Sequence, residues 1–127
     1  MKKFDNWNKI KKEIDNLNDK KYFYERDVWF TKLGCNVGFE QDGNGGDFLR
    51  PVLVYKKFSR SLFLGMPLTK VIKKEKFYFS LKLRGEKTSV ILSQIKLIDS
   101  KRLEYKIGKI SGNELIKIKK QFIELTQ

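Results

Sequence analysis

The sequence predicts a small, mainly β domain with flanking helices, an α+β fold. After residue 26, short segments rich in β-branched, aromatic and aliphatic residues alternate with turn residues. Amphipathic segments stand near both ends of the chain. Hydrophobic residues make up 40% of the 127 residues, which is enough for one core. Several short strands closed by a terminal helix indicate a small, curled antiparallel sheet or barrel.

Residues 4–20 have the spacing of an amphipathic helix. Apolar side chains recur there at steps of three and four, which places them on one helix face: Phe4, Trp7, Ile10, Ile14 and Leu17. This helix either lies against the domain that follows, the interpretation we favour, or extends toward a partner or RNA. We therefore divide the chain into a helical extension, residues 1–24, and a compact domain, residues 25–127.

Six apolar segments have the composition or the period of β-strands: 27–33, 50–56, 62–68, 77–83, 89–95 and 105–110. The second is almost continuously apolar, so we expect it to be central in the sheet. Pro51 is expected only at its start, because proline cannot donate to a strand ladder. The fourth has a period of two, with Phe77, Phe79, Leu81 and Leu83 on the buried side.

The connections between these strands differ in length and character. Residues 34–49 hold five glycines and no apolar period, which predicts a long loop, and long loops in small domains are often functional. Residues 70–75 are almost all charged and predict a basic loop. Shorter connections are expected at 59–60, 84–87 and 100–103, the last as one helical turn.

The C-terminal segment begins with the pattern of a capped helix. Ser111 to Glu114 matches the S-x-x-E capping box, in which two backbone N–H groups are satisfied reciprocally. One apolar face follows, made of Leu115, Ile118, Phe122 and Leu125. A terminal helix of this kind is expected to pack on the sheet.

The charge of the chain favours a polyanionic partner. Lys and Arg total 28 against 15 Asp and Glu, a net charge of +13, which suits RNA, DNA or an acidic protein. A compositional bias toward Lys, as in an AT-rich genome, is the alternative. A single cysteine, Cys35, excludes an internal disulfide, and the absence of His removes the usual zinc ligands. No apolar run approaches the roughly 20 residues of a membrane span, and no signal core starts the chain, so we expect a cytoplasmic protein.

Five motifs occur in an order that resembles the MazF/PemK family of toxins from type II toxin–antitoxin systems. They are Gly38-Phe39-Glu40-Gln41 before a Gly-rich loop, Arg50-Pro51 before an apolar strand, Pro67-Leu68-Thr69, Val90 to Lys96, and Ile98-Asp99 with Lys101-Arg102-Leu103. The resemblance covers residues from about 26 to the C-terminus. Two positions depart from the family pattern: Arg26 stands where a glycine is usual, and Ser93 where an acidic residue is common.

The resemblance implies an SH3-like barrel of the MazF/PemK/CcdB type that forms homodimers. It implies a sequence-specific endoribonuclease that cleaves single-stranded RNA without a metal or another cofactor. It also implies a cognate antitoxin whose acidic C-terminal tail occupies the RNA groove. The family's catalytic arginine and threonine fall on Arg50 and Thr69. Its Gly-x-Glu-Gln glutamate falls on Glu40, and its basic residue after the last strand motif falls on Lys96.

The residue types suit this chemistry. With no histidine, the common acid and base of ribonucleases are missing. Arg50 suits charge stabilisation, because a guanidinium can hold a phosphate through two hydrogen bonds. Thr69 can donate one hydrogen bond, and Glu40 is our hypothesis for the general base. Each also has an ordinary alternative: Arg50 pairing with Asp42 or Asp47, Thr69 as a strand end, and Glu40 as a solvated carboxylate.

Further residues are candidates for RNA contacts: Phe39, Gln41, Lys70, Ser93, Gln94 and Lys96. Phe39 would stack on a base or pin its loop to the core. Lys96 has an obvious phosphate role but equally fits an ordinary surface position. Lys70 and its neighbours Lys73 and Lys74 indicate a solvated face that adds nonspecific attraction.

Two other functions fit parts of the sequence. A gyrase-inhibiting toxin of the same fold would act through its C-terminal helix and would not need Arg50 and Thr69. A plain RNA- or DNA-binding module would use the basic face without cutting. The presence of both Arg50 and Thr69 favours the ribonuclease.

Overall fold

The computed structural model describes residues 21–33 and 48–127. The elements there are β1 (Asp27–Leu33), β2 (Phe48–Lys57), β3 (Leu62–Thr69), β4 (Tyr78–Leu83), β5 (Glu86–Ile91), the 3₁₀ helix η1 (Leu92–Gln94), β6 (Lys96–Asp99), the 3₁₀ helix η2 (Ser100–Arg102), β7 (Leu103–Lys109) and α2 (Gly112–Leu125). The expected helix at 4–20 lies outside the described residues. So does most of the expected Gly-rich loop, with Cys35, Phe39, Glu40 and Gln41.

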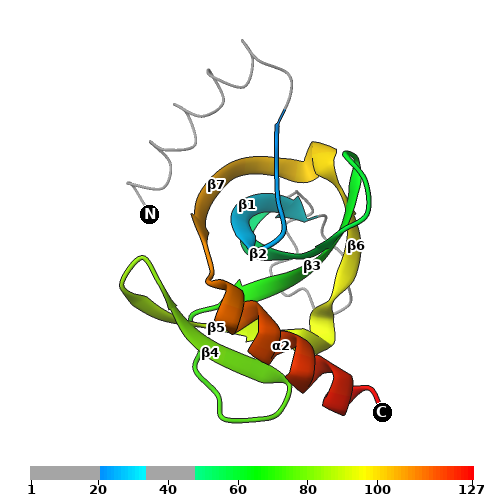
Figure 1. Cartoon of the computed structure of the whole chain (residues 1–127). Coiled ribbons are helices and arrows are strands. Elements are labelled where there is room, and N and C mark those ends of the chain that lie inside the picture. The colour runs from blue at the N-terminus through cyan, green and yellow to red at the C-terminus, as the bar shows by residue number, and fades with distance from the viewer. Residues whose placement is uncertain (1–20, 34–47) are drawn as a thin grey trace.

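All seven strands pair antiparallel in a curled sheet (Figure 1). The order along the sheet is β4-β5-β3-β2-β1-β7, and β6 pairs separately with β3. β3 belongs to both halves: most of it pairs with β2 and β6, while Leu68 and Thr69 at its end pair with β5. The described fold is therefore mainly antiparallel β with one C-terminal α-helix, as the sequence predicts.

β2 is longer than predicted, and Pro51 is its fourth residue rather than its first. The expected position of the proline was therefore wrong, although the physical reason behind it holds. The ladder between β2 and β3 begins at Val52, opposite Pro67, one residue after Pro51. Pro51 itself stands opposite Phe30 of β1. The β2–β3 ladder therefore loses no hydrogen bond to the missing N–H of Pro51, because its pairs start one residue later.

The strand expected at 89–95 is in fact the end of β5 followed by the 3₁₀ helix η1. A tight hairpin starts β5 earlier, at Glu86, because Arg84 (φ 54°) and Gly85 (φ 83°) form the two-residue turn with positive φ that hairpin twist favours. β5 then ends at Ile91, and η1 and β6 follow. The apolar residues on both sides of Ser93 and Gln94 concealed this break, since periodicity cannot separate a buried strand from a short helix.

Two hydrophobic clusters lie on the two faces of the sheet. One contains Val28, Leu53, Met66 and Leu68, together with the buried residues of β4, β5 and α2. The other contains, among others, Trp29, Val52, Val54 and Phe63 from the alternate positions of the same strands. The period of two predicted for 77–83 holds in β4, where Leu81 is buried and Phe79 and Leu83 pack against the first cluster. Phe77, expected on the buried side, is 39% exposed, because it precedes β4 in the connecting loop.

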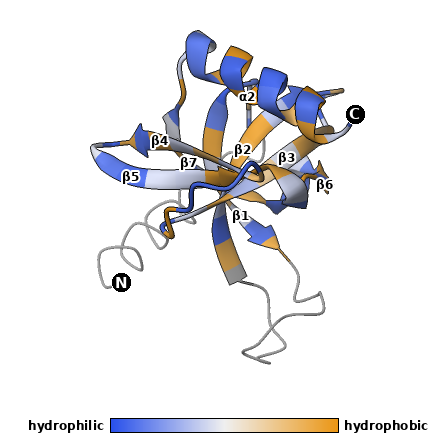
Figure 2. Ribbon diagram, turned by 90° about the horizontal axis from the view of Figure 1, so that it is seen from below, coloured by the Kyte–Doolittle hydropathy of each residue, from blue (hydrophilic) through white to orange (hydrophobic). Residues whose placement is uncertain are grey.

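The capping box of α2 is present as predicted. Ser111 Oγ accepts from Glu114 N–H at 3.0 Å, and Ser111 N–H donates to Glu114 Oε1 at 2.9 Å. Leu115 and Ile118 are buried in the first cluster, and the helix lies across that face of the sheet (Figure 2). No helix in the described part of the chain is long and apolar enough to cross a membrane.

A fully buried carboxylate holds the start of β1, a group we call the Asp27 anchor. Asp27 Oδ2 accepts from Tyr24 N–H at 2.9 Å and from Trp29 Nε1–H at 3.2 Å. Lys106 and Lys109 of β7 bring their ammonium groups to 3.3 Å and 3.9 Å from Oδ1. Every one of these contacts lies within the chain, so this charge serves the fold.

Candidate nucleic-acid interface

A row of polar residues crosses five neighbouring strands of the sheet. Thr31 stands opposite Arg50, Thr69 opposite Ser89, and Ser89 opposite Ser80. The β2–β3 ladder ends at the pair Val52–Pro67, and Arg50 and Thr69 each lie two residues beyond that pair. Opposite residues of antiparallel strands project from the same face, about 5 Å apart at Cα. We call Thr31, Arg50, Thr69, Ser89 and Ser80 the polar row.

Arg50 and Thr69, the two predicted catalytic residues, are 19 positions apart in the chain and lie on the same face of the sheet, because each stands two residues from a member of the Val52–Pro67 pair. Arg50 is half-buried in β2. It makes no ion pair within residues 21–33 and 48–127. The alternative partners considered for it, Asp42 and Asp47, lie outside the described residues. Its guanidinium is therefore a candidate for an external anion.

Thr69 is held at both its backbone and its side chain. Its carbonyl accepts from Thr88 Oγ1 at 3.0 Å, and its own Oγ1 accepts from Val71 N–H at 3.2 Å. A threonine hydroxyl has one hydrogen to donate besides its two lone pairs. The bond from Val71 fixes the oxygen and leaves that hydrogen for an outside acceptor.

The remaining members of the row differ in how their hydroxyls are satisfied. Thr31 is fully buried and donates to Trp29 C=O at 3.0 Å, so its role is structural. Ser89 is also fully buried, yet its Oγ has no hydrogen-bond partner in the described structure. Ser80 is exposed at the β4 edge. Sequence reasoning missed Ser89 and Ser80, because only the strand register reveals that they align with Thr69.

The predicted RNA-binding residues that are described lie around this row. Lys96 of β6 stands opposite Gly65, which shares the Thr69 face of β3 about 13 Å further along the strand. Ser93 and Gln94 are exposed on η1. Lys70, next to Thr69, lies 3.8 Å from Glu86 in a pair that is largely exposed. Phe39, Glu40 and Gln41 lie outside the described residues, so their roles stay predictions.

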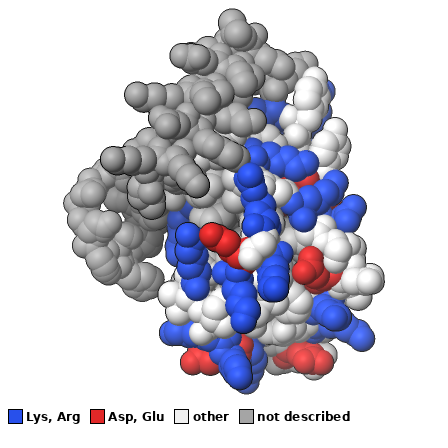
Figure 3. Space-filling view, turned by 90° about the vertical axis from the view of Figure 1, so that its left-hand side faces the viewer, with Lys and Arg blue, Asp and Glu red and all other residues white. Residues whose placement is uncertain are grey.

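Positive side chains dominate one side of the molecule. Figure 3 shows Lys and Arg gathered over the side formed by β7 and the β4–β5 hairpin, with fewer acidic groups between them. Within the described residues, no group of three or more His, Cys, Asp or Glu is placed to hold a metal ion. The chemistry of this surface is that of guanidinium, ammonium and hydroxyl groups, which suit a phosphate backbone.

The comparison with known families agrees with the motifs. Residues 24–126 match the profile described as PemK-like, MazF-like toxin of type II toxin-antitoxin system. The chain belongs to this toxin family. The resemblance drawn from the ordered motifs is thereby confirmed, and the match covers the whole of the predicted compact domain except its last residue. No curated protein sequence matches the chain.

Solved structures of MazF toxins share the fold. Mycobacterium tuberculosis toxin MazF-mt6 superposes with a TM-score of 0.62 at 13% identity, over 80% of this chain and 96% of that one. MazE-MazF from Deinococcus radiodurans gives 0.62 at 19% identity, over 84% and 97%. An endoribonuclease in complex with its cognate antitoxin, from Mycobacterial species, gives 0.61 at 12% identity, over 83% and 95%. At these identities the likeness concerns the fold.

Proposed function

We propose that this toxin is a metal-independent, sequence-specific endoribonuclease that cleaves single-stranded RNA, principally mRNA in the cytoplasm. The observation that carries the proposal is that Arg50 and Thr69 lie on one face of the sheet, each two residues beyond the Val52–Pro67 pair. A guanidinium that has no carboxylate partner among residues 21–33 and 48–127, and a fixed hydroxyl on the same face of the sheet, fit a single phosphate between them. Family membership supports the same activity.

In the proposed reaction the substrate supplies its own nucleophile. The 2′-hydroxyl oxygen attacks the adjacent phosphorus as its proton leaves, and the bond to the 5′-oxygen of the next nucleotide breaks. The leaving 5′-oxygen takes a proton from water, so the products are a 2′,3′-cyclic phosphate and a 5′-hydroxyl. Arg50 stabilises the charge that develops on the phosphorane oxygens, and Thr69 donates to a non-bridging oxygen. Glu40 is the proposed base for the 2′-hydroxyl proton.

The proposal includes the assembly expected of such a toxin. An SH3-like barrel that pairs into a homodimer would form the RNA groove, and an antitoxin with an acidic tail would block it. The structure of a mycobacterial endoribonuclease in complex with its cognate antitoxin supports such a partner. The net charge of +13 makes an acidic tail electrostatically complementary.

One assay tests the reaction class. Purified protein is incubated with end-labelled RNA in excess EDTA, and the product ends are analysed. We expect cleavage that leaves cyclic-phosphate ends, because no step above uses a metal. Intact RNA with a gel shift would instead indicate a binding module, and intact RNA with blocked DNA supercoiling would indicate a gyrase inhibitor; either result contradicts the proposal.

The assignment of Glu40 has its own test. Glu40→Gln keeps the size of the side chain but removes the carboxylate that would take the proton. We expect cleavage to be lost while RNA binding is kept. Full activity in this variant would exclude Glu40 as the base without affecting the roles of Arg50 and Thr69.

A further inference from the structure

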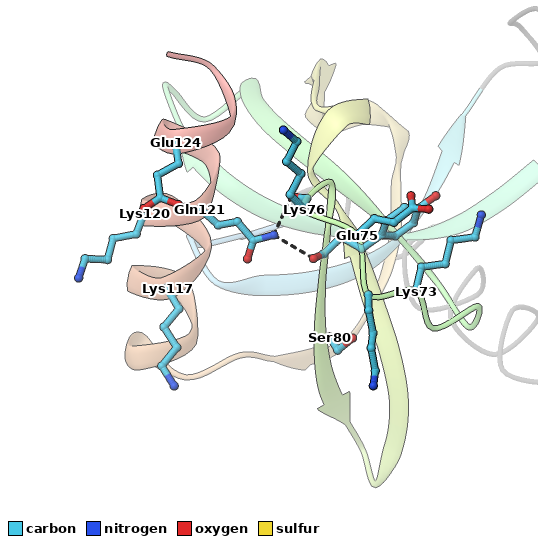
Figure 4. A pocket seen from close by; sticks show the side chains of 10 residues that line it. Lys73, Glu75, Lys76, Ser80, Lys117, Lys120, Gln121 and Glu124 are labelled. Atoms are coloured by element: carbon cyan, nitrogen blue, oxygen red, sulfur yellow. Dashed lines mark hydrogen bonds between the residues drawn. The ribbon is translucent and has the colours of Figure 1, made fainter.

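A basic hollow of about 620 Å³ lies between α2, the loop after β3 and the edge of β4. Five lysines and two glutamates line it, with Tyr78, Ser80 and Gln121: Lys73, Lys74, Glu75, Lys76, Lys117, Lys120 and Glu124. Figure 4 shows the side chains of α2 on one side of the hollow and those of the loop and β4 on the other. We call this feature the lysine hollow.

The walls of the lysine hollow are fixed to each other. Gln121 of α2 donates from Nε2 to the carbonyls of Lys76 at 2.8 Å and Tyr78 at 2.9 Å, as the dashed lines in Figure 4 mark. The Tyr78 carbonyl belongs to β4, which is the last strand of the sheet path, and the Lys76 carbonyl belongs to the loop just before it. One glutamine therefore satisfies the strand edge and ties the helix to the loop, so the lysines on both walls keep a defined spacing.

The lysines of the hollow form no ion pair with the described part of the chain. None of its five lysines has a carboxylate oxygen within 4.0 Å in the described structure. The lysines of the Asp27 anchor, by contrast, share a carboxylate. Lys73 instead places its ammonium 5.6 Å from the centre of the Tyr78 ring. Five lysines against two glutamates leave an excess of three positive charges facing outward.

The hollow lies at the outer edge of β4, where α2, from the first-cluster face of the sheet, and Ser80, from the face of the polar row, both line it. Ser80 lines the hollow and is the last member of the polar row, two strands away from Thr69. Two strand spacings are about 10 Å, which is about three nucleotides at the 3.4 Å rise of a stacked strand. The connecting loop also starts at Thr69 and ends at the hollow. A strand of RNA with its scissile phosphate at Arg50 and Thr69 would reach the hollow within a few nucleotides.

The lining favours a single-stranded nucleic acid over other anions. Small-molecule sites are mostly apolar with a few polar groups, whereas this lining is mostly charged. Sites for single strands combine a positive groove with aromatic rings on which bases stack. Tyr78 is half-buried beside an ammonium group and provides such a ring. An acidic protein segment would use the charges but not the ring.

We infer that the lysine hollow is a second RNA-binding site that holds the phosphates flanking the cleavage site. This inference rests on the proposed ribonuclease function, and it adds a contact surface outside the catalytic pair. The site does not distinguish one base from another, because its donors are ammonium groups that contact phosphate. It would therefore raise the affinity for long substrates more than for short ones.

Binding to an uncleavable strand tests the inference without depending on catalysis. The probe is a fluorescent, fully 2′-O-methylated RNA of about 20 nucleotides, longer than one single-strand site. Its affinity is measured by anisotropy over a range of salt concentrations. The variant is Lys117→Gln/Lys120→Gln, which changes two exposed positions of α2 to a good helix former. The matched control is Arg60→Gln/Lys101→Gln, two exposed positions outside the hollow.

Each phosphate contact contributes about 0.7 to the slope of log K against log salt for single strands. Losing two contacts should lower the slope by about 1.4 and weaken binding about 20-fold near 0.1 M salt. The control should change the slope by less than half of that. Lys117→Arg/Lys120→Arg should retain the wild-type slope, because arginine also contacts phosphate.

The outcomes separate this inference from the proposed function. A normal slope in the Lys117→Gln/Lys120→Gln variant overturns the inference, even if the wild-type protein cleaves RNA. A reduced slope supports it, even if no cleavage is seen and the nuclease proposal fails. If the variant binds RNA normally but loses affinity for polyglutamate, the hollow is a site for an acidic protein segment, and the inference is wrong.

Discussion

The Asp27 anchor and the polar row place charged groups on the same small sheet in opposite ways. At the anchor, a buried carboxylate meets two N–H donors and two ammonium groups of the same chain. In the row and the hollow beside it, Arg50 and five lysines find no carboxylate in the described structure. A charge satisfied internally stabilises the fold, whereas a charge left without a counterion is available to a ligand.

The largest effect should come from removing the guanidinium of the row. Arg50→Ala should slow RNA cleavage by about 10²–10³-fold, since a preorganised donor to a developing anion is worth that much. Affinity for RNA should fall far less than the rate. Thermal unfolding should be nearly unchanged, because Arg50 makes no ion pair in the described structure.

The control for this change is Arg60→Ala, which removes the same charge from the exposed turn between β2 and β3. It should leave the rate within a few-fold of wild type. If Arg50→Ala cleaves RNA at the wild-type rate, Arg50 has no role in the mechanism. The difference in charge pairing between the polar row and the Asp27 anchor would then say nothing about function.

The anchor should show the reverse behaviour. Asp27→Ala removes the acceptor of Tyr24 N–H and Trp29 Nε1–H, and it leaves the indole N–H buried without its partner. We expect a loss of about 2–4 kcal/mol in the free energy of unfolding, from two charge-assisted hydrogen bonds. Chemical denaturation measures it, at a temperature where the variant remains folded.

The matched change is Asp99→Ala, which removes an exposed carboxylate that accepts only from Lys101 N–H. It should cost about 1 kcal/mol or less, as for an exposed cap. Equal losses for the two aspartates would show that burial of Asp27 contributes nothing beyond a local cap.

The polar row contains two buried hydroxyl groups, of Thr31 and Ser89, that differ in whether they have a hydrogen-bond partner in the described structure. Thr31→Val removes a hydroxyl that donates to Trp29 C=O, so it should cost about 1 kcal/mol. Ser89→Ala removes a hydroxyl without a partner in the described structure, so stability should be unchanged or rise by a similar amount. A clear loss in Ser89→Ala, measured in the same denaturation series, would show that this hydroxyl is satisfied in solution.

Much of this architecture could be predicted from the sequence, because local rules determine it. The period of two in β4, the S-x-x-E capping box and the apolar stripe of α2 each depend on a few neighbouring residues. The order of the five motifs then indicated the family that the profile confirms.

Arg26 shows that the backbone conformation can persist after a substitution. It replaces the family's usual glycine, yet its φ is 83°, in the left-handed region that favours glycine.

The parts that could not be predicted depend on contacts between distant segments. β6 was missed because four residues after an apolar run carry too little pattern, and only pairing with β3 makes them a strand. The polar row needs the register of four ladders, which no single segment specifies. The lysine hollow joins α2 to the loop after β3; the sequence indicated the basic loop at 70–75 but not that α2 lies beside it.

The smallest effect should come from changing Lys70. Like the lysines of the Asp27 anchor it lies near a carboxylate, and like those of the lysine hollow it is exposed to solvent. It lies 3.8 Å from Glu86, but both side chains are mostly exposed, at 86% and 71%. Such a pair contributes at most a few tenths of a kcal/mol and is screened by salt. Lys70→Gln should therefore leave the midpoint of denaturation within error of wild type.

Binding of the 2′-O-methylated RNA should lose about 0.7 from its salt slope, because Lys70 is adjacent to Thr69 and would contact one phosphate. Glu86→Gln is the matched change, since it frees Lys70 and should leave that slope unchanged or raise it. A stability loss in Lys70→Gln with a normal salt slope would assign Lys70 to the fold, with the Asp27 anchor, instead of to the RNA surface.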